Sequence, residues 1–280
     1  MNPQESSPGE VPILTIRAVF FDLDDTLLWD ERSVEETFAH VCAYAASRRG
    51  VDPRRLEEAV REEARKLYAS YETYPFTQNI GINPFEALWA DFRLGEDPNF
   101  RKLERLAPEY RRSAWTLGLK AAGVDDPELG AELGRMFYEE RRKRPYVYDD
   151  TFPVLRLLKD RYILLLLTNG APDLQQEKLD GVPELAPHFR HIVISGHFGQ
   201  GKPSPALFAH ALELAGVGPD EAAMVGDKLT TDILGASRSG VTSVWINRRG
   251  IRREGDIVPD FEIANLMELP DVIRRIDERG

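Results

Sequence analysis

Two aspartates that directly follow an apolar run, Asp22 and Asp24, have the spacing in this chain that most suggests chemistry. The run 19–21 is β-branched or aromatic without polar alternation, which is typical of a strand buried on both faces of a parallel sheet. In open α/β sheets, ligands bind beyond the carboxyl ends of the strands. Carboxylates this close repel each other unless a cation lies between them or one is protonated, so the pair predicts a divalent metal site. A solvated turn is the alternative, because aspartate is common in turns.

Polar residues able to bind phosphate follow later in the chain. Thr168 and Asn169 come directly after the apolar run 162–167, and a hydroxyl with backbone amides can hydrogen-bond a phosphoryl oxygen, although Thr-Asn-Gly is also an ordinary turn. Lys202 lies in a chain far richer in arginine than in lysine, and its ammonium could neutralise a phosphate and a carboxylate together. The glycines before Lys202 nearly complete a P-loop, but Pro203 stands where that motif needs Ser or Thr.

A second pair of acids, Asp227 and Asp232, follows the apolar run 222–225 at the expected start of a helix. Their alternative role is to cap that helix and interact with its dipole. Four carboxylates converging with one lysine would instead form a hard-cation site, because magnesium prefers oxygen ligands and keeps water and substrate phosphate in its shell.

The elements that would position these residues alternate along the C-terminal half of the chain. Apolar runs and amphipathic segments follow one another there, which predicts an α/β fold with a doubly wound parallel sheet and helices on both faces. After the first strand, the expected elements are strands 162–167, 191–195, 222–225 and 242–246, and helices 152–159, 173–179, 205–215, 231–239 and 266–278.

Between the first strand and this half, residues 31–147 show helical periodicity and no convincing strand. The spacing of Ser33 and Glu36 predicts a capping box for the first helix, and Gly50 is expected to end it. The segment 71–83 is dense in aromatic and amide side chains, and either shapes a substrate pocket or packs between helices. The basic clusters 111–112 and 141–144 are expected on solvated helix faces, with contact to an anionic substrate as the alternative. The expected helices are 33–50, 53–71, 84–92, 109–119 and 127–142.

These patterns predict a flexible N-terminal tail (1–11), an α/β core (12–30 and 148–280) and a helical cap domain (31–147). The net charge of −11 and the pI near 5.1 argue against nucleic-acid and anionic-membrane partners, which reward clustered Lys and Arg. A single cysteine, Cys42, suits a reducing cytosol. The most apolar run is too short to cross a bilayer, which needs about 20 residues. We expect a cytoplasmic monomer or homodimer.

Together, the polar residues after the strands resemble the four sequence motifs of the haloacid dehalogenase (HAD) superfamily of hydrolases, in the expected order. The helical insertion resembles the α-helical cap of the branch that contains phosphoglycolate phosphatases, N-acylneuraminate-9-phosphatases and pyrimidine nucleotidases. The residues that carry the resemblance are Asp22-x-Asp24-x-Thr26, Thr168-Asn169-Gly170, Lys202 before Pro203, Gly226-Asp227 with Asp232, and Trp245-Ile246-Asn247.

The resemblance implies that Asp22 attacks phosphorus to form an aspartyl phosphate, and that Asp24 protonates the departing alcohol and then activates water. Asp25 replaces a glycine frequent in the first motif, which we interpret as tolerated variation in a solvated turn. The implied phosphate-binding residues are Thr168, Asn169 and Lys202. The implied magnesium ligands are Asp22, the backbone carbonyl of Asp24, Asp227 and Asp232, the last directly or through water.

The expected activity is therefore a magnesium-dependent phosphatase acting on a small phosphorylated metabolite, with a cap that opens and closes over the site. Asp24 argues against a haloacid dehalogenase, because that branch lacks the second aspartate. A phosphomutase and a non-catalytic binding module on the same fold remain alternatives. Sugar phosphates, phosphoglycolate, nucleoside monophosphates and phosphoserine are the candidate substrates.

Overall fold

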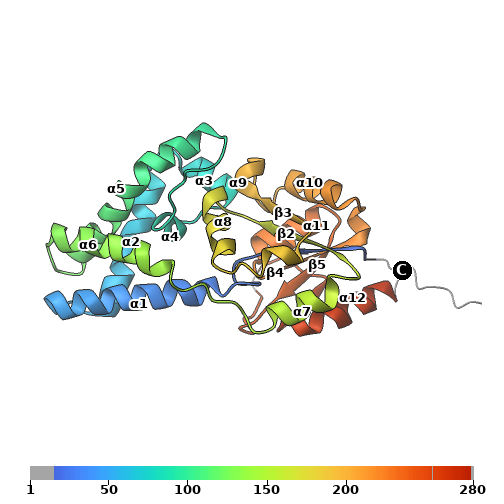
Figure 1. Ribbon diagram of the computed structural model, residues 1–280. Coiled ribbons are helices and arrows are strands. Elements are labelled where there is room, and N and C mark those ends of the chain that lie inside the picture. The colour runs from blue at the N-terminus through green and yellow to red at the C-terminus, as the bar shows by residue number, and fades with distance from the viewer. Residues whose placement is uncertain (1–15, 254, 279–280) are drawn as a thin grey trace, which may run out of the picture.

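A parallel sheet of six strands forms one half of the structure, a computed structural model that describes residues 16–253 and 255–278 (Figure 1). The strands lie in the order β3-β2-β1-β4-β5-β6, and every neighbouring pair is parallel. Their bounds are β1 (Ala18–Phe21), β2 (Ile163–Thr168), β3 (His191–Ile194), β4 (Ala222–Gly226), β5 (Thr242–Ile246) and β6 (Phe261–Ile263). The predicted doubly wound parallel sheet is confirmed, and β6 is an edge strand that the sequence pattern did not predict.

The first strand, β1, lies in the middle of the sheet between β2 and β4. Phe21, the last residue of β1, is paired with Leu166 of β2 and with Val225 of β4, so these three strands end within two residues of one another. The chain adds β2 and β3 on one side of β1 before it crosses to β4 on the other, so the strand order reverses beside β1. Ligands bind at such a switch point, in the crevice outside the carboxyl ends of the strands.

Helices cover both faces of this sheet. They are α7 (Thr151–Leu158), α8 (Pro172–Asp180), α9 (Ser195–Phe198), α10 (Pro205–Ala215), α11 (Leu234–Arg238) and α12 (Leu269–Asp277), with a π-helical turn at Leu229–Ile233. Val19 and Phe21 of β1 belong to the hydrophobic cluster that includes α7 and α12, whereas Ala18 and Phe20 belong to the cluster that includes α10 and α11. Because successive side chains of a strand point to opposite faces, the unbroken apolar sequence of β1 fills both layers.

The other half of the structure is helical and lies between β1 and β2 in the sequence (Figure 1). We call residues 30–141 the helical unit. It has a hydrophobic cluster of its own, in which the rings of Phe38, Trp115 and Phe137 pack together at centroid distances of 4.7 to 5.6 Å. Its helices are α1 (Asp30–Arg49), α2 (Pro53–Ser70), α3 (Tyr74–Ile80), α4 (Pro84–Ala87), α5 (Pro98–Ala121) and α6 (Pro127–Arg141).

The first helix starts earlier than predicted. It begins at Asp30, so Ser33 lies inside the helix, and its hydroxyl donates a hydrogen bond of 2.6 Å to the carbonyl of Arg144. The predicted capping box of Ser33 and Glu36 is therefore wrong, because the chain that returns to the sheet supplies the partner of Ser33. Gly50 ends the helix in the left-handed conformation, with φ of 65°.

Other predicted boundaries in the helical unit also move. The segment 71–83 contains α3, the expected helix 84–92 shortens to α4, and the expected helix 109–119 is the second half of α5, which continues through Pro108. A proline normally ends or kinks a helix, but α5 packs against both α2 and α6, which support it across that position. Arg141, expected on a solvated face, is buried.

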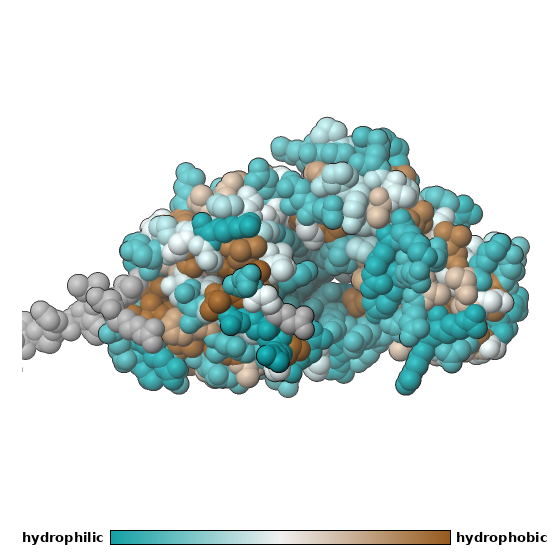
Figure 2. All heavy atoms as spheres, turned by 180° about the vertical axis from the view of Figure 1, so that it is seen from behind, coloured by the Kyte–Doolittle hydropathy of each residue, from teal (hydrophilic) through white to brown (hydrophobic). Residues whose placement is uncertain are grey.

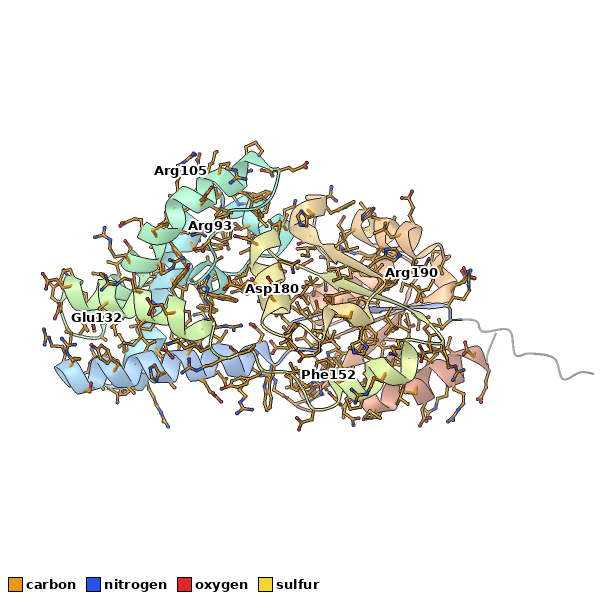
Figure 3. The ribbon with its side chains drawn as sticks, in the orientation of Figure 1. Arg93, Arg105, Glu132, Phe152, Asp180 and Arg190 are labelled. Carbon is orange, nitrogen blue, oxygen red and sulfur yellow. The ribbon has the colours of Figure 1, made fainter. Side chains whose placement is uncertain are left out.

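Helix α8 joins the two halves. Its Leu174 belongs to the hydrophobic cluster of the helical unit, and its Leu179 belongs to one cluster of the sheet. Figure 3 shows the helix between the two halves, with Asp180 marking its last residue. Side chains on α8 therefore reach both halves of the molecule.

The predicted tail 1–11 lies outside the described residues. Within the ranges 16–253 and 255–278, no helix is both long and apolar enough to cross a membrane. Cys42 is buried in the helical unit, and burial raises the pKa of its thiol to about 12.

Candidate active site

Asp22 directly follows β1 and forms a buried ion pair with Lys202. The Nζ atom of Lys202 donates a 2.5 Å hydrogen bond to Oδ1 of Asp22 and another of 2.7 Å to the carbonyl of Leu167, and it lies 2.7 Å from Oδ1 of Asp232. Burial raises the pKa of Asp22 to about 7, against the opposing charge of Lys202 and with a further increase from Asp232. One ammonium thus contacts two carboxylates from different strand ends.

The loop that carries Lys202 is held from two sides. The amide of Asn169 accepts a 2.8 Å hydrogen bond from the main-chain N–H of Lys202 and donates one of 3.0 Å to its carbonyl. From the helical unit, Asn79 donates to the carbonyl of Gly199 and accepts from the N–H of Gly201 through its own carbonyl. The predicted contact of Asn169 with phosphate stays a prediction, since its side chain is engaged in holding Lys202.

Three carboxylates gather beside this ion pair. Asp22, Asp227 and Asp232 each place one oxygen within 4.8 Å of the others. Burial, followed by the charges of Asp22 and Asp232, raises the pKa of Asp227 well above its usual value. Asp232 accepts a hydrogen bond from the N–H of Lys228, and a Cβ atom on Gly226 would lie 2.3 Å from its Cγ. Glycine at position 226 therefore lets Asp232 approach the end of β4.

Asp24 lines the same cleft but lies outside this cluster. Its Oδ2 accepts hydrogen bonds of 2.7 Å from Lys178 and 3.2 Å from Gln175, both on α8. The amide of Gln175 also donates 2.6 Å to the hydroxyl of Thr168, which is buried at the end of β2. The carboxylate of Asp24 is thus not part of the three-residue cluster, and the predicted metal contact of its main-chain carbonyl stays a prediction.

Sequence reasoning missed the partners of Asp24. Gln175 and Lys178 are three residues apart on one helix face, a spacing found in most amphipathic helices, so they carried no recognisable signal. Lys178 also bonds to Glu86 of α4 at 2.9 Å and lies 3.8 Å from Asp30 of α1. Burial lowers the pKa of Lys178, but the charges of its three carboxylate partners together raise it by more. The net effect is a raised pKa, so this lysine stays charged.

Asp25 lies in a turn, as predicted, but the turn is half-buried and not solvated. Its φ of 58° is in the left-handed region, where glycine is favoured. Its Oδ1 accepts a 2.8 Å hydrogen bond from the N–H of Glu31 in the first turn of α1. Burial raises the pKa of this carboxyl to about 7. Asp25 therefore ties the end of β1 to the start of the helical unit.

These residues line one cleft between the two halves. Figure 2 shows the molecule hollowed there, with hydrophilic residues around the opening. The segment 71–83 packs partly between helices, as one alternative had it, and partly faces the cleft, while a contact with substrate stays a prediction. Tyr71 and Tyr74 pack among rings of the helical unit, while Gly81 and Asn83 line the cleft. The main cleft residues are, from the sheet, Asp22, Asp24, Lys202 and Asp227 and, from the helical unit, Asp30 and Glu86.

Comparison with known proteins places this geometry in a family. A family model described as haloacid dehalogenase-like hydrolase matches residues 16–240. The chain is 39% identical over 259 residues to the phosphoserine phosphatase of Thermus thermophilus, covering 91% of this chain and 98% of that protein. It is 30% identical to the N-acylneuraminate-9-phosphatase of Mus musculus, covering 94% and 95%. A crystal structure of a HAD phosphatase from Thermococcus onnurineus matches with a TM-score of 0.57 and 28% identity, covering 92% and 98%.

The chain belongs to the haloacid dehalogenase-like hydrolases. This confirms the resemblance drawn from the four motifs. The two sequence relatives given above, each covered to 95% or more of its length, are named phosphatases, so the chain is a phosphoric monoester hydrolase.

Proposed function

We propose that the chain is a magnesium-dependent phosphatase that hydrolyses a small phosphorylated metabolite through an aspartyl phosphate on Asp22. It works in the cytoplasm, as a monomer or homodimer. The observation that carries this proposal is the convergence of Asp22, Lys202 and Asp227 at the switch point of the sheet, in a cleft closed on its other side by the helical unit.

The position of Asp22 suits a nucleophile. Its Oδ1 is held by Lys202, which fixes the carboxylate and can neutralise a phosphoryl oxygen in the same place. An oxygen of Asp22 attacks phosphorus, the bond from phosphorus to the alcohol oxygen breaks, and Asp24 gives that oxygen a proton. Asp24 then takes a proton from water as the water attacks the aspartyl phosphate, which releases phosphate and restores Asp22.

The cluster of Asp22, Asp227 and Asp232 fits magnesium. It offers the oxygen ligands that this ion prefers. Burial raises the pKa of Asp22 and Asp227, so the ionised carboxylates need positive charge beyond that of Lys202. When bound, magnesium would neutralise charge on the carboxylates and the phosphoryl group. Because both oxygens of Asp232 lie near nitrogen atoms, we propose that it acts through water, while Asp22, Asp227 and the carbonyl of Asp24 bind directly.

The division into domains is also a proposal. The helical unit has its own hydrophobic cluster and lines the cleft opposite the strand ends, which supports residues 31–147 as a cap and residues 12–30 and 148–280 as the core. In this assignment the core handles phosphate and the cap meets the leaving group. Phosphoserine is the first substrate to test, because a phosphoserine phosphatase is 39% identical to the chain. N-acylneuraminate 9-phosphate is the second, from the 30% identical relative.

Of three alternatives on this fold, two have less support and the third is separated by experiment. A haloacid dehalogenase has no alkoxide to protonate, whereas Asp24 is held in the cleft beside the carboxylate cluster. A binding module without catalysis would not need the buried ion pair between Lys202 and Asp22. A phosphomutase would return the phosphoryl group to substrate, so release of inorganic phosphate separates it from the proposed phosphatase.

The test is phosphate release from a panel of phosphorylated metabolites, with magnesium and with a chelator. We expect activity that the chelator removes and that Asp22→Asn lowers by about 10³-fold or more, as for other lost nucleophiles. Asp220→Asn, at an exposed position, is the control. Acid-quenched enzyme should carry phosphate on Asp22, detected by peptide mass spectrometry. Undiminished turnover by Asp22→Asn, or phosphate on another residue, would overturn the nucleophile.

A further inference from the structure

The two oxygens of the Asp24 carboxylate have different surroundings. Oδ2 accepts hydrogen bonds from Lys178 and Gln175, at 2.7 and 3.2 Å. Oδ1 is buried and has no hydrogen-bond partner among the residues that the structure describes. Asp24 lines the cleft. A buried carboxylate oxygen without a donor is unfavourable in the protein alone, so this atom is the one suited to contact a substrate.

Lys178 is buried, and its ammonium bridges the two halves of the molecule. Besides Asp24 it contacts Glu86 at 2.9 Å, and it lies 3.8 Å from Asp30. Both of these carboxylates belong to the helical unit, whereas Lys178 itself is on α8. An ammonium withdrawn from water needs such partners, because its desolvation is otherwise uncompensated. The lysine that holds Asp24 is therefore held in turn from the helical unit.

The carboxylates on the helical unit are themselves fixed. Glu86 accepts a 3.0 Å hydrogen bond from the main-chain N–H of Asn83, as part of the capping box of α4. Asp30 forms an ion pair with Arg141, whose guanidinium lies over the ring of Trp89 at 4.5 Å. A continuous series of contacts thus runs from the interior of the helical unit through Lys178 to Asp24.

We propose that Lys178 is a positioning residue for Asp24 and that Glu86 keeps Lys178 in place. Lys178 and Gln175 occupy Oδ2, so Oδ1 gives its proton to the leaving alcohol oxygen as the bond to phosphorus breaks, and later takes a proton from the attacking water. Asp24 is aligned only when the helical unit lies against α8. This inference rests on the proposed function, in which Asp24 is the acid and base.

The experiment compares leaving groups that differ in their need for a proton. β-Glycerophosphate has an alkyl leaving group and p-nitrophenyl phosphate has one that departs as a stable anion. We measure the single-turnover rate of enzyme phosphorylation for Lys178→Met and Lys178→Arg. Lys178→Met should lower the rate with β-glycerophosphate about 10- to 100-fold, part of the 10²- to 10⁴-fold that acid–base catalysis supplies. With p-nitrophenyl phosphate the loss should stay under about threefold, since this step needs no acid.

The matched control is Arg142→Met. Arg142 also links the helical unit to α8, through an ion pair with Glu177, but it does not contact Asp24. Removal of the Arg142 side chain should leave the ratio of the two rates within about twofold of wild type, because none of its contacts positions Asp24. Lys178→Arg, which keeps the charge, should recover part of the β-glycerophosphate rate without changing KM. Equal losses on both substrates, or a Lys178→Met ratio equal to that of Arg142→Met, would overturn the proposal.

A second pair of variants separates alignment from folding. Lys178→Met leaves the carboxylate of Glu86 buried beside an apolar side chain, so its Tm should fall. The double variant Lys178→Met with Glu86→Gln removes that charge and should recover Tm but not the β-glycerophosphate rate. Recovery of the rate together with Tm would show a structural role only. If wild type releases no phosphate, or Asp22→Asn remains active, the proposed function fails first; if both behave as expected, only the role of Lys178 is in question.

Discussion

The side-chain amide of Asn169 hydrogen-bonds both the main-chain N–H and the main-chain carbonyl of Lys202. One residue at the end of β2 thereby sets the position of the lysine that contacts Asp22. Asn169→Ala should remove both bonds and let the Lys202 loop shift. We expect kcat/KM to fall about 10- to 100-fold, the scale of a misplacement near 1 Å. Steady-state kinetics on the best substrate of the panel checks this.

Asn247 provides a matched control for that variant. Its amide holds the main chain of Ile251 in the same way, with hydrogen bonds of 2.9 Å to the N–H and to the carbonyl. The amide of Asn247 also donates 2.7 Å to Glu262, so Asn247→Ala should lose at least as much free energy of unfolding, about 1 to 3 kcal/mol for three hydrogen bonds, but keep most of its activity. If both variants lose activity equally, the effect is general loosening and not the placement of Lys202.

Magnesium affinity should depend on pH near neutrality. Burial raises the pKa of Asp22 to about 7 in the protein without metal, so below this pH a proton occupies the carboxylate and must leave before a cation binds. Affinity should therefore fall as pH is lowered from about 8 to about 6, with proton release on binding. Isothermal titration in buffers of different ionisation enthalpy measures both quantities. Affinity that stays constant over this range would contradict the expectation.

Asp25 should stabilise the junction of β1 and α1. Asp25→Ala removes the acceptor of the Glu31 N–H. The alanine keeps the unfavourable left-handed φ of 58° but no longer has the hydrogen bond that offsets its cost. We expect the free energy of unfolding to fall by about 1 to 2 kcal/mol. Asp25→Gly loses the same hydrogen bond but suits the left-handed backbone, so its loss should be smaller. Urea denaturation of the two variants gives the order, and a larger loss for glycine would disprove this account.

Substitution of Gly226 should weaken magnesium binding more than it lowers the stability of the fold. In Gly226→Ala the new Cβ would lie 2.3 Å from Cγ of Asp232, so the carboxylate must move. We expect at least about tenfold weaker magnesium binding, because outer-shell partners of metal sites typically contribute 10- to 100-fold. Gly218→Ala is the control, since its Cβ would meet the carboxylates of Asp220 and Glu221, at 2.8 and 3.6 Å, and neither belongs to the cluster. Thermal shifts on adding magnesium should shrink in the first variant and not in the second.

The arrangement of the sheet was accessible from sequence because its signals are local. Each of Asp22, Thr168 and Asp227 directly follows an apolar run, and parallel strands place such residues at one edge. The strand β6 was missed because its three residues, Phe261–Ile263, are too few to show a period. The end of α1 at Gly50 could also be predicted, because a glycine after two arginines is a local signal for the end of a helix.

The partners of Asp24 could not be predicted in this way. Lys178 meets Glu86 across 92 residues of sequence, and that contact depends on how the helical unit lies against α8. Likewise, Ser33 looked like a cap because its true partner, the carbonyl of Arg144, is remote in the chain. Charge and spacing along one helix do not specify which distant side chain will face it. Roles that depend on orientation therefore require coordinates.

Helix α8 buries its first turn in one core and its last turn in the other. A swing of residues 30–141 away from the sheet must expose Leu174 to water or carry part of α8 along. Exposure of a single leucine costs roughly 1.5 to 3 kcal/mol. By that free-energy cost alone, the swung-out form would make up about one molecule in ten to one in two hundred. A wide separation of the two halves would then be a rare excursion, and a small substrate would enter and leave mainly through the existing opening of the cleft.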